Sequence, residues 1–275
     1  MAQLYIQQRK NNLTYFTAPS FSETQVVSHA FTTRLGGVSA GKYDSLNLGL
    51  FTADKPDNIL ENRRRVCQTL NIGIENLVGG HQVHGDHVYC VTKADQGRGA
   101  TGRRPVIPDT DALMTNEPGM ALITFFADCA PVLFLDPVKK VIALAHAGWK
   151  GTVAKIAVKT VQAMGERYGA QPQRLLAVVG PSIGPCHYQI DRPVLEKVQE
   201  AFPGAWPRLL TGFTGEDHAY LNLWEANSLQ LIEAGLVKDN ITVMNLCTYC
   251  HQDLLFSHRA GMAGRQAAVL MLNQE

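Results

Sequence analysis

The chain has 275 residues, 45% of them hydrophobic and 18% charged, and its formal net charge is +1. This composition can bury a substantial core and excludes wholesale disorder. The balanced charge lacks the basic stripe of a nucleic-acid-binding protein, so no nucleic acid is an expected partner.

The N-terminal residues 1–12 are polar and hold no apolar core of the length that a secretory signal peptide needs. No stretch approaches the roughly 20 apolar residues that span a bilayer. We therefore expect a cytoplasmic protein with no membrane partner. The six cysteines are sparse for this length, so thiols, metal ligands or core residues are expected rather than a disulfide framework.

The first predicted elements are a strand, a loop and a helix. Residues 26–33 read as a strand, and residues 34–49 contain too many glycines for a regular element. Pro56 opens a helix that runs to about residue 71, with apolar side chains at helical spacing. Three consecutive arginines at 63–65 must fan over most of this helix, so at least one should face whatever the helix packs on.

Four strand-like runs follow, and an exposed loop rich in Gly, Arg and Pro at residues 94–108 lies after the first. The runs cover residues 82–91, 121–126, 132–135 and 141–145. The last three are apolar almost throughout, as expected of strands covered on both faces. An amphipathic helix is predicted from residue 151 to a stop at Gly169.

The remaining sequence is predicted to alternate strands and helices. Strands are expected at 175–179, 241–246 and 267–272, and helices at 192–202 and 221–234. No repeat, low-complexity linker or clear boundary interrupts the chain. We therefore expect a single α+β domain over residues 1–275.

Three potential metal ligands stand at the ends of short apolar runs, each beside a small or turn-forming residue: His84, Cys129 and His146. Strand ends that open into turns are where a rigid scaffold presents chemistry. Two imidazoles and one thiol give a soft, tetrahedral-leaning metal three ligands and leave a fourth position open, as in catalytic zinc sites. Zinc and copper both accept these ligands, so zinc is expected and copper stays an alternative.

The histidine region also has a plain structural interpretation. His81, His84 and His87 are spaced by three, so on a continuing strand His84 would point away from the other two. Partly exposed strand histidines would explain the same pattern. Gly85 favours the functional interpretation, because glycine lets another group approach the backbone closely.

The other two candidates have similar alternatives. Cys129 could be a simple buried thiol, although the adjacent Asp128 is expensive to bury without orienting a histidine or taking a proton. His146 could merely end a strand. However, the turn that follows it leads into a helix start, where an anion or a thiolate would be stabilised.

Residues 247–251 read Cys-Thr-Tyr-Cys-His, the spacing of a zinc knuckle or a redox pair. A single CxxC motif without a second pair of potential ligands is weak evidence for a zinc site. No thioredoxin-type βαβ unit precedes it, so a redox role also has little support. A structural role, or one residue lining a pocket, is the plainer interpretation. Farther along, His258, Arg259 and Arg265 are polar enough to contribute to a site, but spacing alone assigns them no role.

Several ordered segments resemble the laccase-domain family, the multicopper polyphenol oxidase-like proteins that include bacterial purine nucleoside phosphorylases and human FAMIN. The matching text is TRLGGVS at 33–39, SLNLG at 45–49, NR at 62–63, QVHG at 82–85, ADCAPVL at 127–133, HAGWKG at 146–151 and GPSIGPC at 180–186. Lys150 stands where the family usually has arginine, and His187 where a second cysteine is frequent.

This resemblance implies an α+β fold with two mixed sheets sandwiched between helices, in α/β/β/α layers. The family's metal or catalytic trio falls on His84, Cys129 and His146. The implied activity is phosphorolysis of adenosine, inosine and S-methyl-5′-thioadenosine to base and ribose 1-phosphate, with some adenosine deamination. The expected partners are therefore small purine nucleosides and phosphate, bound by a monomer or a homodimer.

Deamination would follow from the ligand set. Zinc on the trio would lower the pKa of bound water to about 7 and make hydroxide available to attack C6 of the purine. Asp128 is the candidate for carrying the proton to the leaving ammonia.

Phosphorolysis needs phosphate held against the anomeric carbon while the base leaves. The planar fork of arginine binds phosphate bidentately, so Arg63 is the first candidate and Arg34 the second. Asn47 is expected to make polar contacts to the nucleoside. These three assignments rest on the family motifs together with side-chain chemistry.

Other functions would use the same residues. A metal-independent cysteine hydrolase or amidase would take Cys129 as thiolate nucleophile, with His146 or His84 as its base. A non-enzymatic module that binds a metal or small molecule is a further possibility. Polyphenol oxidation with copper is disfavoured by ligand count, because an oxidase with several coppers needs many more converging histidines than one trio.

Overall fold

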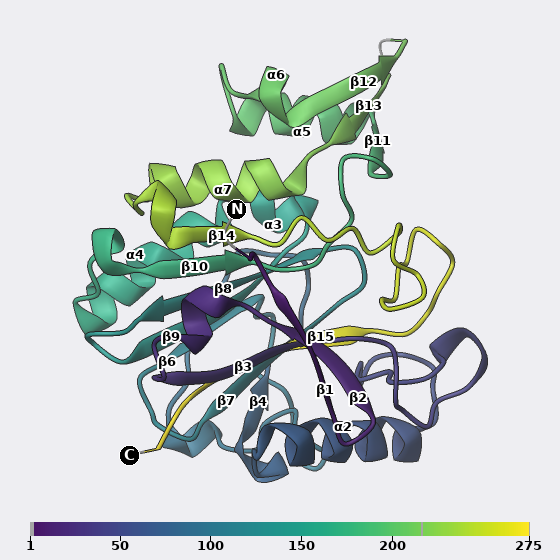
Figure 1. Cartoon of the computed structure of the whole chain (residues 1–275). Coiled ribbons are helices and arrows are strands. Elements are labelled where there is room, and N and C mark those ends of the chain that lie inside the picture. Colours follow the sequence, from purple (N-terminus) through teal and green to yellow (C-terminus); the bar gives the residue numbers. More distant parts are fainter. Residues whose placement is uncertain (1–2, 216, 275) are drawn as a thin grey trace.

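Two six-stranded mixed sheets lie face to face at the centre of the computed structural model, which describes residues 3–215 and 217–274 (Figure 1). A large cluster of buried apolar side chains fills the space between them. Helix α2 (Pro56–Leu70) covers the outer face of the first sheet, and α4 (Ile156–Tyr168) and α7 (Leu223–Glu233) cover the second. The layers therefore run α/β/β/α, which confirms the predicted α+β sandwich.

The first sheet has the strand order β1-β2-β3-β15-β7-β4. Its strands are β1 (Ile6–Lys10), β2 (Leu13–Thr17), β3 (Val27–Thr32), β15 (Gln266–Leu272), β7 (Ala121–Phe126) and β4 (Leu77–Gly79). Strand β15 is buried between β3 and β7 and runs antiparallel to both, so the C-terminal segment completes this sheet. The β1–β2 hairpin escapes sequence-based prediction because β1 is a short polar edge strand.

The second sheet has the order β14-β10-β8-β9-β6-β5. Its strands are β14 (Ile241–Val243), β10 (Leu176–Val179), β8 (Ala130–Asp136), β9 (Val141–Ala147), β6 (Ala112–Thr115) and β5 (Val88–Cys90). All residues of β8 and β9 are buried, as their continuous apolar runs predict. Strand β6 was not expected, because four residues after a long loop give too short a pattern to recognise.

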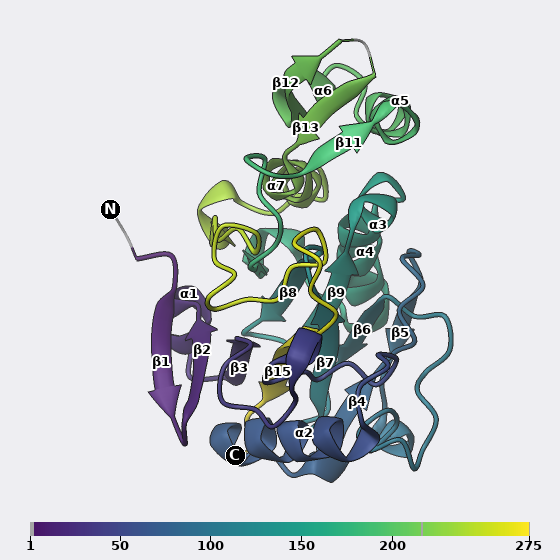
Figure 2. The same ribbon diagram turned by 90° about the vertical axis from the view of Figure 1, so that its right-hand side faces the viewer.

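A smaller unit projects beyond one end of the second sheet (Figures 1 and 2). It consists of β11 (Gln189–Asp191), β13 (His218–Leu221) and β12 (Leu210–Thr214) with α5 (Arg192–Ala201) and α6 (Trp206–Leu209). Its own apolar cluster packs toward α7 and α3 (Trp149–Val153). The remaining helix, α1 (Pro19–Ser22), is short. Within the described ranges, no helix combines the length and apolar character needed to cross a bilayer.

Two predicted elements are wrong in detail. Residues 81–87 form no strand, and His84 adopts a left-handed backbone with φ of 61°. The alternation argument for the three histidines of this segment therefore fails, because it needs a continuous strand. The helix expected from residue 151 is broken into α3 and α4, since Lys155 also takes a positive φ, 62°.

Candidate active site

His84, Cys129 and His146 converge at one end of the second sheet. One ring nitrogen of each histidine and Sγ of Cys129 lie within 4.8 Å of one another. Cys129 lies in the turn between β7 and β8, His146 near the end of β9, and His84 in the irregular segment between β4 and β5. Rigid, neighbouring strands thus bring together residues that are far apart in sequence.

The separations within this trio suit a tetrahedral metal ion. Zinc–nitrogen bonds of about 2.1 Å and zinc–sulfur bonds of about 2.3 Å place neighbouring ligand atoms about 3.4–3.6 Å apart. The observed limit of 4.8 Å is compatible with these values after small side-chain rotations. Three protein donors leave one tetrahedral position for water or substrate. His146 is buried and His84 exposed, so the trio has an accessible side.

A buried aspartate that escaped sequence-based prediction, Asp111, organises two of the three ligands. Its Oδ1 lies 2.9 Å from Nδ1 of His146 and accepts a hydrogen bond of 3.0 Å from the His84 N–H. Its Oδ2 accepts hydrogen bonds from the N–H groups of Val83 at 3.1 Å and Gly85 at 2.8 Å. Asp111 therefore leaves Nε2 of His146 free to face the trio and fixes the strained backbone at His84.

The electrostatics of the trio favour a thiolate beside an imidazolium. Burial would raise the pKa of Cys129, but the charge of His146 and hydrogen bonds from both histidines lower it to about 6. Burial would likewise lower the pKa of His146, yet Cys129 and Asp111 raise it to about 9. Burial would raise the pKa of Asp111, but hydrogen bonds from His146 and from backbone N–H groups keep it below the usual value. The Cys129 thiolate and the Asp111 carboxylate therefore stabilise positive charge, either on His146 or on a metal ion.

Gly148 provides the space that the thiol occupies. A Cβ atom at this position would lie 2.7 Å from Sγ of Cys129 and 3.3 Å from Cδ2 of His84. At Gly85, where the sequence suggested a close approach, a Cβ would lie 3.5 Å from Oδ2 of Asp111, an ordinary contact. The glycine whose missing side chain matters is therefore Gly148.

A cavity of about 460 Å³ opens beside the trio, a typical size for a small-molecule site. All three members of the trio line it. Its other walls combine aromatic rings with two arginines: Phe51, Phe125, Phe126, Trp149, Tyr188, Arg259 and Arg265. The cavity therefore offers flat apolar surfaces for a ring system and positive charge for an anion.

Asp128 also lines this cavity, but its carboxylate is engaged. Its Oδ1 accepts a hydrogen bond of 2.6 Å from Oγ1 of Thr248, and its Oδ2 accepts one of 2.7 Å from the N–H of Arg259. These bonds tie the loop after β14 to the turn that holds Cys129. The role of Asp128 as a proton carrier stays a prediction, and the carboxylate that contacts the trio is Asp111.

Arg63, the first candidate for phosphate binding, lies behind the cavity wall. Its side chain is 1% exposed, and its guanidinium donates hydrogen bonds to the carbonyls of Leu48, Gly99 and Ala100. The guanidinium also lies over the ring of Phe125. One arginine of the run therefore does face inward, as expected of three consecutive arginines on a helix, and it joins loops together. Its contact with phosphate stays a prediction.

Arg34 and Asn47 also lie outside the residues that line the cavity. Arg34 donates hydrogen bonds to the carbonyls of Asp44 at 2.7 Å and Gln252 at 2.9 Å. Asn47 is buried, and its Oδ1 accepts a hydrogen bond of 2.9 Å from the N–H of Arg265. Asn47 therefore contacts the backbone of a cavity arginine, and the contacts to substrate expected of Arg34 and Asn47 stay predictions.

Arg259 and Arg265 are the arginines that do face the cavity. The guanidinium of Arg259 donates a hydrogen bond of 2.9 Å to the carbonyl of Gln189 and lies over the ring of Tyr188. Burial lowers the pKa of Arg265, while the nearby Cys129 counteracts that effect, so its charge lies close to the trio. Sequence reasoning noted both arginines only as polar residues of one segment, because nothing local shows which way they point.

Comparisons with known proteins place these features in a family. Residues 28–273 match the family described as multi-copper polyphenol oxidoreductase laccase. The chain is 39% identical over 246 residues to "Purine nucleoside phosphorylase YlmD" of Geobacillus stearothermophilus, with 89% of each chain covered. It is 33% identical over 240 residues to "Purine nucleoside phosphorylase LACC1" of Homo sapiens, covering 84% of this chain and 51% of the human protein.

Solved structures agree over almost the entire chain. The structure of YlmD from Geobacillus stearothermophilus has a TM-score of 0.93 at 35% identity, with 99% of this chain and 100% of that chain covered. Protein NMB0706 of Neisseria meningitidis has a TM-score of 0.79 at 27% identity, again over 99% of this chain and 100% of that one. The shared fold therefore includes the sheets on which the trio is built.

Proposed function

The chain belongs to the multi-copper polyphenol oxidoreductase laccase family, and from this membership we propose that it is a purine nucleoside phosphorylase. The observation that carries the proposal is that relatives bearing this name align with about nine-tenths of the chain. The family match over residues 28–273 spans the trio and the residues that line the cavity. In the reaction a phosphate oxygen bonds to C1′ of the ribose, the C1′–N9 bond breaks, and the purine leaves with a proton. Adenosine, inosine and S-methyl-5′-thioadenosine are the proposed substrates.

The cavity supports this assignment chemically. Rings such as Phe125 and Tyr188 offer stacking surfaces for a purine. Arg259 and Arg265 offer planar forks for phosphate, which must lie beside C1′ as the base departs. We also place the reaction in the cytoplasm, since none of the six cysteines is paired in a disulfide, as a reducing compartment favours.

We further propose that the trio binds zinc, with copper as the alternative, and that adenosine deamination is a second activity. The donor set of two imidazoles and one thiolate fits either metal. Zinc in such a site supplies a Lewis acid and lowers the pKa of water. Asp111 keeps His146 in the orientation that ligation needs, and Asp128 is the proposed proton carrier toward the leaving group.

One observation favours a second candidate function. Cys129, His146 and Asp111 form a chain of contacts in which a thiol of low pKa meets a histidine held by a carboxylate. That arrangement also activates cysteine nucleophiles in hydrolases without a metal. Chelators separate the two candidates, because they would abolish a metal-dependent activity and leave a cysteine hydrolase active.

Product identification tests the proposal directly. The protein is incubated with adenosine, with and without phosphate, and the products are separated by chromatography. Adenine and ribose 1-phosphate that appear only with phosphate would support phosphorolysis, and inosine without phosphate would support deamination. No change in any of the three nucleosides, together with copper-dependent oxidation of a polyphenol, would overturn the proposal.

A substitution at Arg265 tests how the phosphate is held. Arg265→Gln is expected to raise the KM for phosphate at least about tenfold, since a charge-assisted bidentate contact contributes about 1.5–3 kcal/mol. The matched control is Arg64→Gln, because Arg64 is exposed on α2 and forms an ion pair with Glu61 at 4.0 Å, away from the cavity. An Arg265→Gln enzyme with an unchanged KM for phosphate would remove this residue from the site.

A further inference from the structure

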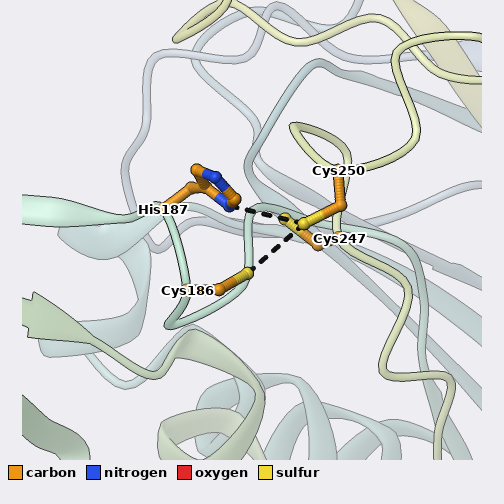
Figure 3. Close-up of side chains that lie close together, drawn as sticks. All are labelled: Cys186, His187, Cys247 and Cys250. Carbon is orange, nitrogen blue, oxygen red and sulfur yellow. Dashed lines mark hydrogen bonds between the residues drawn. The ribbon is translucent and has the colours of Figure 1, made fainter.

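Four potential metal ligands lie together outside the active site: Cys186, His187, Cys247 and Cys250 (Figure 3). Their ligand atoms, three sulfurs and one ring nitrogen, all lie within 4.8 Å of one another. Figure 3 shows the side chains pointing toward one another from two separate loops. We call this group the quartet. We propose that the quartet binds a zinc ion with a structural role.

The distances in the quartet are close to those of a tetrahedral zinc site. Sγ of Cys186 lies 3.6 Å from Sγ of Cys250, which in turn lies 3.4 Å from Nδ1 of His187. Standard zinc bond lengths place sulfur atoms about 3.8 Å apart and a sulfur about 3.6 Å from a nitrogen. An ion would therefore need shifts of only a few tenths of an ångström from these donors.

The backbone holds the two halves of the quartet together without help from their side chains. Ser182 and Cys247 form an isolated parallel β-bridge. In it the N–H of Ser182 donates to the carbonyl of Leu246 at 3.2 Å, and the N–H of Thr248 donates to the carbonyl of Ser182 at 3.0 Å. The donors are thus brought close by the fold, so an ion would bind a largely preformed site.

The histidine that completes the quartet is not the one next to the CxxC motif. Nδ1 of His251 lies 2.9 Å from the carbonyl of Cys247, so this ring is engaged elsewhere. The ring of His187 stacks on Tyr249 with centroids 4.2 Å apart, and this stacking holds Nδ1 near Cys250. The two further ligands that the CxxC motif needs are therefore Cys186 and His187, more than fifty residues earlier in the chain.

The chemistry of the donors favours zinc over a disulfide. Three cysteines and one histidine form a closed set of the kind that structural zinc sites use. A disulfide between Cys186 and Cys250 would leave Cys247 and His187 unexplained. Sγ of Cys247 also accepts a hydrogen bond of 3.2 Å from the N–H of Gly184, and such outer contacts stabilise metal-bound ligands. On binding zinc, each coordinating thiol would release its proton to solvent.

The position of the quartet explains what the ion would do. Tyr188, which lines the cavity, directly follows His187, and Thr248, which bonds Asp128, lies between the two cysteines of the motif. A zinc ion would clamp these two loops together and so hold one wall of the cavity. It would not touch the substrate.

Metal analysis of the full-length protein tests this inference. The zinc content of the double variant Cys186→Ser/Cys250→Ser is compared with that of the unsubstituted protein. We expect a loss of about one zinc per chain, since one closed site binds one ion. The control is Cys90→Ser, which removes a thiol that contacts Tyr168 outside both groups and should retain all zinc. This difference in zinc content does not depend on what the trio binds. The test of the quartet can therefore fail or succeed independently of the proposed enzymatic function.

Two further measurements cover a double variant that fails to fold. His187→Cys should keep the zinc, because four thiolates also form a closed site. Cobalt exchanged into Cys129→Ser should show strong thiolate-to-cobalt charge-transfer absorption from the three remaining quartet thiols. Full zinc retention in the double variant would overturn the inference. So would absence of that absorption, or a protein lacking quartet zinc whose mass shows Cys186 and Cys250 joined in a disulfide.

Discussion

The two groups of potential metal ligands in this molecule differ in how many donors they have and what holds them. The trio of His84, Cys129 and His146 has three donors, presented by strands and turns of the central sheets beside a cavity. The quartet has four donors, in two short segments of loop outside the sheets. Similar residue types thus form a set of three donors beside the cavity and a set of four donors away from it. The number of donors, more than their kind, separates a reactive centre from a structural one.

Their electrostatic surroundings differ in the same direction. Asp111 lies behind the trio and contacts His146. Burial would raise the pKa of Cys129, but the charge of His146 and hydrogen bonds from both histidines lower it to about 6. In the quartet, burial and the neighbouring thiols of Cys250 and Cys247 raise the pKa of Cys186 to about 12. The trio therefore holds a thiolate near neutral pH by itself, whereas the quartet needs a cation to deprotonate its thiols.

Removing one sulfur from each group should give the largest contrast. Cys129→Ser is expected to lower kcat/KM by more than about 100-fold, since loss of a partner behind a metal ligand already costs about 10–100-fold. Cys250→Ser should leave kcat/KM within a few-fold, because this residue does not line the cavity. Steady-state kinetics with adenosine and phosphate measure both. Equal losses in the two variants would abolish the distinction between reactive and structural sites.

Removing the carboxylate behind the trio should give the next largest effect. In Asp111→Asn, the His146 ring loses the partner that stabilises its charge and orientation, so the pKa of His146 should fall and that of Cys129 should rise. We expect metal affinity or kcat/KM to fall about 10–100-fold. Competition with a chromogenic chelator measures the affinity.

The matched control for this substitution is Asp109→Asn. Asp109 is a neighbouring aspartate that is exposed, and its carboxylate lies 3.3 Å from Nδ1 of His81, which is not a member of the trio. It should behave like the unsubstituted protein. If the two variants lost affinity to the same extent, the charge of the segment rather than the contact with His146 would be responsible.

The sequence predicted the trio because each member stands in its own recognisable local setting. His146 lies near the end of an apolar strand, and Cys129 lies in a turn between two such strands, so neighbouring strands bring them together. His84 does lie beside Cys129 and His146, although the strand from which its direction was predicted is absent from residues 81–87. Its position depends on hydrogen bonds to Asp111, which a local pattern does not contain.

The positions of Asp111, the quartet and the cavity arginines depend on contacts between distant segments, and these contacts could not be predicted from the sequence. Asp111 precedes a strand too short to recognise, so nothing indicated that it faces His146. The CxxC motif is visible in sequence, but its partners at 186–187 are not adjacent to it. Arg63 was expected to bind phosphate, and only the fold shows that three carbonyls from distant loops surround it.

Adding a methyl group beside Cys129 should have a smaller effect than deleting a ligand. The Cβ of Gly148→Ala would lie 2.7 Å from Sγ of Cys129, so the thiol must move by several tenths of an ångström. We expect a fall in kcat/KM of about tenfold, less than the roughly 100-fold that a 1 Å displacement can cost. Gly85→Ala is the control, because its Cβ would make only ordinary contacts. Equal kinetics for both variants would mean that the thiol position is not critical.

The smallest expected effect is on thiol alkylation. At pH 7 the alkylation rates of Cys129 in the trio and Cys250 in the quartet should differ several-fold. In protein stripped of metal with a chelator, the thiolate of Cys129 forms as pH rises through its pKa of about 6. Its alkylation by iodoacetamide should therefore be half-maximal near that pH and nearly constant above pH 7. Burial raises the pKa of Cys250, so alkylation of this more exposed thiol should still be increasing at pH 9.

Peptide mass spectrometry after timed labelling measures each site separately. Buried Cys67, with its pKa raised to about 12, supplies the unreactive reference. A common midpoint for Cys129 and Cys250 would mean that exposure alone controls reactivity, and that the contact between Asp111 and His146 does not reach the sulfur.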